Sequence, residues 1–200
     1  MTGRRLTSED LADLVRLTLR DPASAGRQIM ALNLGRDALW TALALVASVN
    51  TLILSVSAMM LPPSGLPAFF DSPLAMFVIL TGVLVLTVHA IYWTGQALGG
   101  QGDLGDLLAL LVWLQGLRVG VQFIVTLLLF AAPTLSLVVS LVAGVWALWI
   151  SLHFIAVTFG FASLGKAAGV LLVATIGLIL GLGMLMSLIG LSIMGGTASV

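Results

Sequence analysis

The sequence predicts an all-α fold, a polytopic transmembrane helical bundle with five spans and an N-terminal amphipathic helical arm. Of the 200 residues, 60% are hydrophobic and 8% are charged, whereas charged residues make up about 25% of an average soluble domain. Eleven of the sixteen charged residues lie within positions 1–37, and the rest of the chain consists mainly of long apolar runs. We therefore expect residues 1–37 to form the arm and residues 38–200 to form a membrane domain.

The arm is expected to contain two short helices. Residues 6–20, LTSEDLADLVRLTLR, predict the first, because Thr7 and Asp10 approximate a capping box. Its apolar stripe follows helical spacing and consists of Leu11, Leu14, Val15 and Thr18. Asp21 and Pro22 then predict a stop and a restart, with Asp21 as N-cap and Pro22 in the first turn. The second helix is expected to run to about Leu34.

Two placements of this arm remain open from the sequence. Its basic face could lie on the membrane surface near anionic lipid head groups. Its apolar face could instead pack onto the protein's own bundle. The candidate contacts with lipid phosphates are Arg16, Arg20, Arg27 and Arg36.

Five apolar runs are each long enough to cross about 30 Å of hydrocarbon as a helix. The prolines of LPPSGLPAFFDSP, residues 61–73, predict a loop between the first two runs. A glycine-rich turn precedes the third run, a short Ala-Ala-Pro connection follows it, and GFASLGKAAG precedes the fifth. The expected spans are residues 38–60, 74–95, 107–130, 134–161 and 168–194.

The distribution of Lys and Arg predicts the orientation. With five spans, the arm, the turn at 96–106 and the loop around Lys166 share one side of the membrane. The loops on that side contain six arginines and one lysine, and the loops on the other side contain none. Because loops rich in Lys and Arg stay in the cytosol, we expect a cytosolic N-terminus and arm, and a C-terminus on the outer side.

A glycine motif precedes the third span. The run from Gly100 to Gly105, GQGDLG, matches the G-x-G-x-x-G pattern of dinucleotide-binding proteins. That chemistry requires a preceding strand and a βαβ unit, whereas here a membrane span precedes the motif. We interpret the residues as a flexible cytosolic turn, with Asp103 and Asp106 near a helix N-terminus, where acidic side chains are favoured.

One polar layer lies inside the predicted membrane domain. Gln115, Arg118 and Gln122 share one face of the third span, and Asn50 is expected at a similar depth on the first. A charge at this depth costs roughly 3 kcal/mol on insertion scales and is a functional hypothesis by default. Arg118 could instead extend toward lipid phosphates or enter a local hydrogen-bond network. The alternatives are thus a structural role or a transport or lipid-translocation site.

Residues suited to catalysis or cofactor binding are sparse. The chain has no cysteine and two histidines, His89 and His153, and two imidazoles without a third ligand are weak evidence for a metal. There is no H-E-x-x-H motif and no acidic pair inside a span. We expect no enzymatic activity, no cofactor and no metal site, and at zero net charge no nucleic-acid partner. The lipid bilayer is the partner that the composition implies, and no protein partner can be named.

Four segments resemble the bacterial members of the Yip1 family. They are Asp21-Pro22 with the following Arg27, LGGQGDLGDLLALL at 98–111, WALWISLHFIAV at 146–157 and FASLGKAAGVLLV at 161–173. Together they cover most of the chain from about residue 18. Gln101 stands where a basic residue is common in the family, and Asp103 and Gly105 depart from its usual turn.

For bacterial members the resemblance implies an integral membrane protein of unsettled function, and it offers no site residues to transfer. Our leading expectation is a non-enzymatic, multi-pass protein of the bacterial inner membrane that acts in membrane organisation or as a protein or lipid interaction module. Eukaryotic relatives bind Rab-type GTPases in vesicle transport. That role is not carried over, because this chain lacks their DLYGP-type segment.

Overall fold

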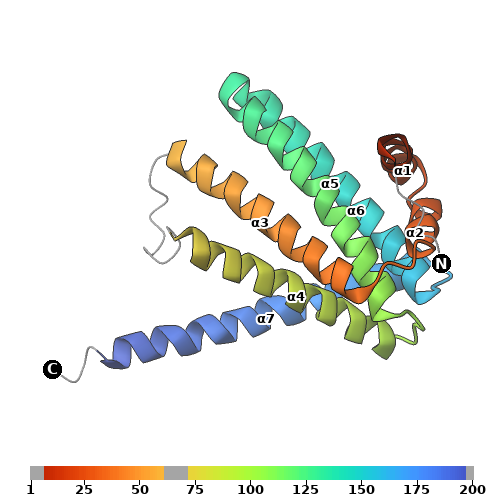
Figure 1. Ribbon diagram of the computed structural model, residues 1–200. Helices are drawn as coiled ribbons and strands as arrows, with labels where there is room; N and C mark the ends of the chain where they lie inside the picture. The colour runs from red at the N-terminus through yellow and green to blue at the C-terminus, as the bar shows by residue number, and fades with distance from the viewer. Residues whose placement is uncertain (1–6, 61–71, 197–200) are drawn as a thin grey trace.

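The computed structural model describes residues 7–60 and 72–196, and within them the chain forms seven helices. Five of these helices, α3 to α7, are long and apolar enough to cross a membrane, which confirms the predicted fold class. The helices, shown in Figure 1, are α1 (Ser8–Arg20), α2 (Pro22–Met30), α3 (Arg36–Met60), α4 (Pro73–Ala97), α5 (Leu104–Ala131), α6 (Pro133–Phe159) and α7 (Leu164–Gly196).

The predicted caps of the arm are present. The Thr7 hydroxyl accepts a hydrogen bond from the Asp10 backbone N–H at 3.2 Å, and the Asp10 carboxylate accepts one from the Thr7 N–H at 2.9 Å. Asp21 caps α2 by accepting from the Ser24 N–H at 3.1 Å. The second helix is shorter than expected, because it ends at Met30 and Asn33 adopts a left-handed φ of 45° that breaks the helical geometry.

The membrane-spanning helices differ from the expected spans by a few residues at their ends. α5 begins at Leu104, because the Asp103 carboxylate accepts a 2.7 Å hydrogen bond from the Gly105 N–H and caps the helix. α6 stops at Phe159, where Gly160 follows with a φ of 68° as a left-handed cap. Most of the predicted loop at 61–73 lies outside the described residues, except that Ser72 caps α4 and Pro73 occupies its first turn.

The five long helices form a closed ring at one end of the bundle. Around that ring the packed neighbours follow the order α6, α5, α3, α4 and α7, and α7 returns to α6. Figure 1 shows the helices converging beside α1 and α2 and diverging toward their opposite ends. We call the convergent end, which carries the arm and the turns at 98–103 and 160–163, the arm end.

The buried core is concentrated at the arm end. On α5 the buried run is Leu107 to Leu110, in the second turn of the helix, and on α6 Phe154 is 1% exposed. Toward the diverging ends, large apolar side chains such as Phe123, Leu141 and Ile179 are exposed. In a membrane protein such side chains face lipid. The bundle is therefore held together mainly at the arm end.

Candidate functional site

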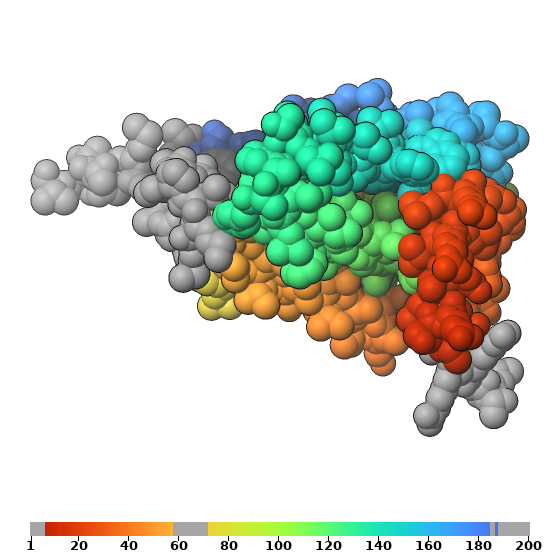
Figure 2. Space-filling view, turned by 90° about the horizontal axis from the view of Figure 1, so that it is seen from above, coloured from red at the N-terminus to blue at the C-terminus, as the bar shows by residue number. Residues whose placement is uncertain are grey.

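The arm packs across the bundle rather than standing away from it. Figure 2 shows α1 and α2 lying across one end of the bundle of long helices. α2 packs on α6 and α5. Its Gly26 lies so close to Phe154 that an added Cβ would sit 3.4 Å from the ring, and the neighbouring Ala25 and Ile29 are buried. Packing of the apolar face on the bundle, one of the two placements left open by the sequence, is thus observed.

A hydrogen bond joins α1 to the third span. Thr18 is fully buried, its hydroxyl donates to the Leu14 carbonyl at 2.7 Å, and it accepts from the Trp113 indole N–H at 3.0 Å. Sequence reasoning placed Thr18 in the apolar stripe of α1 but did not identify its partner. The sequence feature that pointed to a partner was a hydroxyl within an apolar stripe, because a buried hydroxyl requires a hydrogen-bond partner.

The outer face of the arm carries the predicted arginines, and all four are exposed. Arg16 pairs with Asp13 at 3.1 Å, and Arg27 donates to the Ser24 hydroxyl at 2.9 Å. Arg20 and Arg36 form no ion pair or side-chain hydrogen bond among the described residues. Packing of the inner face on the bundle leaves the basic outer face exposed. The arginine side chains therefore remain available to a membrane surface.

Asp21, between the two arm helices, is held in its ionised form. Hydrogen bonds from the side chain and the backbone N–H of Ser24 lower the pKa of this carboxyl below its ordinary value of 3.8, and the nearby Arg27 lowers it further. The carboxylate therefore caps the N-terminus of α2 with its full charge at neutral pH.

The glycine motif is a packed turn at the arm end. Cβ atoms added to Gly95 or Gly100 would collide with Phe159 of α6, in the case of Gly100 at 2.6 Å. The Gln101 N–H donates to the Phe159 carbonyl at 3.3 Å, and the Gln96 side-chain amide donates to the Gly102 carbonyl at 2.8 Å. The expected flexible turn is therefore fixed against α6. Helices flank it on both sides, so the βαβ unit that a dinucleotide site requires is not formed there.

Aromatic side chains gather on the membrane helices near the arm end. Trp40 of α3 stacks on His89 of α4 at 6.4 Å, and Trp93 meets the edge of the same ring at 6.1 Å. His153 packs against Trp149 of α6 at 4.8 Å. Each predicted histidine thus has a tryptophan neighbour. Such aromatic rings mark the interface between hydrocarbon and head groups.

The four residues of the predicted polar layer do not form one network. Arg118 is exposed and donates to Gln115 at 3.4 Å, whereas Gln122 donates to Thr126 at 3.4 Å. Asn50 is half-buried on α3, which packs beside α5, but no hydrogen bond joins it to these side chains among the described residues. Asn50 and Arg118 each lie about 21 Å from the arm end of their helices at 1.5 Å per residue, which agrees with the expected common depth.

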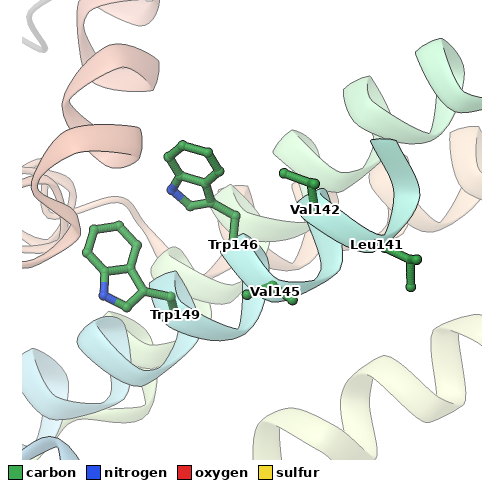
Figure 3. A pocket seen from close by; sticks show the side chains of 5 residues that line it. All are labelled: Leu141, Val142, Val145, Trp146 and Trp149. Carbon is green, nitrogen blue, oxygen red and sulfur yellow. The ribbon is translucent and has the colours of Figure 1, made fainter. Parts of the chain in front are cut away.

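An apolar groove runs along one side of α6. It has a volume of about 540 Å³, and its lining residues all come from this helix: Leu141, Val142, Val145, Trp146 and Trp149. Figure 3 shows both indoles projecting from the same side of the helix. The surface of the groove is almost entirely apolar, and its polar groups are the indole N–H groups of the two tryptophans, so it is suited to lipid chains in general.

Comparison with known proteins assigns the chain to a family. No match was found among curated proteins or among solved structures. The family model of the Yip1 domain matches residues 16–188, which include the end of α1, all of α2 to α6, and about three quarters of α7. The chain belongs to the Yip1 family.

Proposed function

We propose that this chain is a non-enzymatic protein of the bacterial inner membrane that acts in membrane organisation as a lipid or protein interaction module. In this proposal the arm is the contact surface, and anionic lipid head groups are its ligands. The observation that carries the proposal is the arm itself, which packs across the bundle through one face and exposes four arginines on the other.

The lengths of the helices support an arm at the level of the head groups. α5 has 28 residues, hence about 42 Å at 1.5 Å per residue, which exceeds a hydrocarbon core of about 30 Å. The arm contacts α5 at Trp113, about 14 Å from the first residue of the helix. If that level is the interface, the remaining length of α5 matches the hydrocarbon core. α1 and α2 then lie in the membrane plane, as amphipathic interfacial helices do.

The excess of basic residues in the loops of the arm end supports a cytosolic location for this end. Because the chain has no cysteine, single cysteines can report the orientation without background. A cysteine in place of Gln101 should react with a membrane-impermeant thiol reagent only after the membrane is opened. A cysteine in place of Ala132, at the other end of the bundle, should react in intact cells. The reverse pattern would overturn the orientation.

The lipid contact is tested by removing charge from the arm. Arg20→Gln with Arg27→Gln should reduce co-purification of phosphatidylglycerol relative to phosphatidylcholine by about thirtyfold, since each of the two cations near an anionic surface contributes about 1 kcal/mol. The control Arg20→Lys with Arg27→Lys keeps the charge and should retain the lipid. Equal lipid ratios for the wild type and the glutamine variant would contradict the proposal.

Transport through the Arg118 layer finds less support. Its four side chains are divided between separate contacts, and Arg118 itself is exposed. A binding site for a transported solute instead needs polar groups that converge on one enclosed space.

A further inference from the structure

A second cavity lies at the arm end, between the arm and the first turns of two spans. It has a volume of about 280 Å³ and is lined by the end of α2, the link at 33–35, and the beginnings of α3 and α5. Its apolar walls include Ile29 and Leu39, each 2% exposed. Its charged lining residues are Arg36, Asp103 and Asp106. The cavity therefore combines one cation and two carboxylates with an apolar wall.

These opposite charges share the cavity without pairing. Among the described residues, Arg36 forms no ion pair within 4 Å with either carboxylate and no side-chain hydrogen bond. Asp106 likewise has no hydrogen-bond partner there. Asp103 accepts one hydrogen bond, from the Gly105 N–H. Arg36 and Asp103 are exposed to solvent and Asp106 is half-buried, so all three charged groups are accessible to a ligand that supplies both signs.

The level of the cavity points to a lipid head group. Arg36 precedes Trp40 by one helical turn, and Asp106 precedes Trp113 by about 10 Å at 1.5 Å per residue. Tryptophan rings mark the boundary between hydrocarbon and head groups. The cavity therefore lies just beyond that boundary, on the water side, where the phosphate and its substituent are found.

We propose that this cavity binds the phosphoethanolamine head group of a membrane phospholipid. Its primary ammonium donates hydrogen bonds to the carboxylates of Asp106 and Asp103, and its phosphate accepts from the Arg36 guanidinium. Charge-assisted hydrogen bonds of this kind are about twice as strong as neutral ones. Of the four exposed arginines the site uses Arg36, and it does not depend on anionic lipid binding at Arg16, Arg20 or Arg27.

The charges disfavour the other common head groups. A choline head group has the same charges but no N–H donor for Asp106. A glycerol head group supplies no cation and places its phosphate near two carboxylates. A divalent cation alone would be attracted by the two carboxylates but would leave Arg36 without an anionic partner.

The test uses the full chain in mixed micelles with equimolar phosphatidylethanolamine, its mono- and dimethylated forms, phosphatidylcholine and phosphatidylglycerol, all with the same acyl chains. Bound lipid is counted by native mass spectrometry. We expect the amount of bound phosphatidylethanolamine to exceed that of bound phosphatidylcholine about tenfold. The amount of bound lipid should fall with each added methyl group. Equal binding across the methylation series, or preference for phosphatidylglycerol after the arm arginines are neutralised, would overturn the proposal.

Two variants test whether the selectivity for phosphatidylethanolamine over phosphatidylcholine arises in this cavity. Asp106→Asn and Arg36→Gln should each bring the ratio of phosphatidylethanolamine to phosphatidylcholine close to one. Asp13→Asn, which removes an exposed carboxylate of α1 away from the cavity, should leave the ratio unchanged. Retained selectivity in both cavity variants would contradict the assignment. The wild-type methylation series decides the proposal even where a variant fails to fold.

Two further comparisons distinguish lipid binding in this cavity from binding of a free metabolite and from lipid binding at the arm arginines. Soluble glycerophosphoethanolamine at millimolar concentration should compete weakly, and full displacement of bound lipid would mean a site for a free metabolite, against the proposal. Neutralising Arg20 and Arg27 should lower binding of phosphatidylglycerol and leave binding of phosphatidylethanolamine intact. The arm proposal and the cavity proposal can therefore fail separately.

Discussion

The indole N–H of Trp113 donates a 3.0 Å hydrogen bond to the hydroxyl of Thr18, and the two residues lie 95 positions apart in the chain. Thr18 is fully buried where α1 contacts the third span. The bond therefore joins the amphipathic arm to the membrane domain, and it fixes the level on α5 at which the arm crosses the bundle.

Thr18→Val removes the acceptor at nearly constant shape and should weaken the docking of the arm. An unsatisfied indole N–H costs about 1–3 kcal/mol. Amide hydrogen exchange in α1 should rise, while exchange in α3 to α7 changes little. In the cycle with Trp113→Phe, the two substitutions should couple by about 1 kcal/mol. Thr41→Val, at an exposed hydroxyl bonded only within α3, is the matched control, and equal exchange in both variants would contradict the role of the bond.

Gly95→Ala should destabilise the bundle, because the added methyl meets the Phe159 ring. Overpacking of this kind costs about 1–3 kcal/mol, more than the gain of about 1 kcal/mol in helix propensity. Gly177→Ala is the control, since nothing lies within 4 Å of its added Cβ. Thermal unfolding in detergent should be lowered only by the first substitution.

The cause of this effect can be isolated with Phe159→Ala. That change removes the ring and leaves a cavity, so it is destabilising by itself. Gly95→Ala should then add little further loss, because the atoms it would meet are gone. Simple additivity of the two losses would show that the glycine has another role.

Acidification should loosen the junction between α1 and α2. Hydrogen bonds from Ser24 lower the pKa of Asp21 from 3.8 in the folded arm. Its contribution to stability is thus complete above pH 3.8 and is lost as the pH falls below that value through the folded pKa. Asp21→Asn keeps a capping side chain without the charge. The difference in α2 amide exchange between wild type and variant should narrow in acid, and a constant difference would contradict the linkage.

Arg118→Leu should leave expression intact and should raise thermal stability in detergent. Placing this charge within a membrane span costs roughly 3 kcal/mol on insertion scales, and its hydrogen bond to Gln115 is long at 3.4 Å. The thermal stability of Gln122→Leu, which replaces an uncharged polar residue on the same helix, is the comparison for the loss of the Arg118 charge. Loss of lipid flux across vesicles in the Arg118 variant, with folding intact, would instead favour the transport alternative.

The sequence is sufficient to predict the parts of this fold that depend on local physics. Apolar runs of sufficient length identify the five membrane helices, and the capping box at Thr7 and the Asp21-Pro22 pair locate the arm helices. The ends of the spans were predicted less accurately, because caps such as Asp103 and Gly160 shift them by two or three residues.

Contacts between distant segments could not be predicted in this way. Gly100 and Gly102 of the motif lie against Phe159 on another helix, and no local pattern reveals that neighbour. The cavity around Arg36 likewise combines segments that are far apart in sequence. The predicted polar layer is the opposite case, because its residues were expected to lie together at one depth and their side chains form separate contacts.

The central claim, that the arm lies in the plane of the head groups, is tested most directly by measuring its depth in a bilayer. The chain has no cysteine, so a single spin label can be placed at Ala12 on the exposed face of α1. Power-saturation electron paramagnetic resonance in vesicles with anionic lipid should place this label within a few ångströms of the phosphates, and Arg20→Gln with Arg27→Gln should move it toward water. A label in bulk water in the wild-type protein, at the same depth in the variant, would contradict the claim.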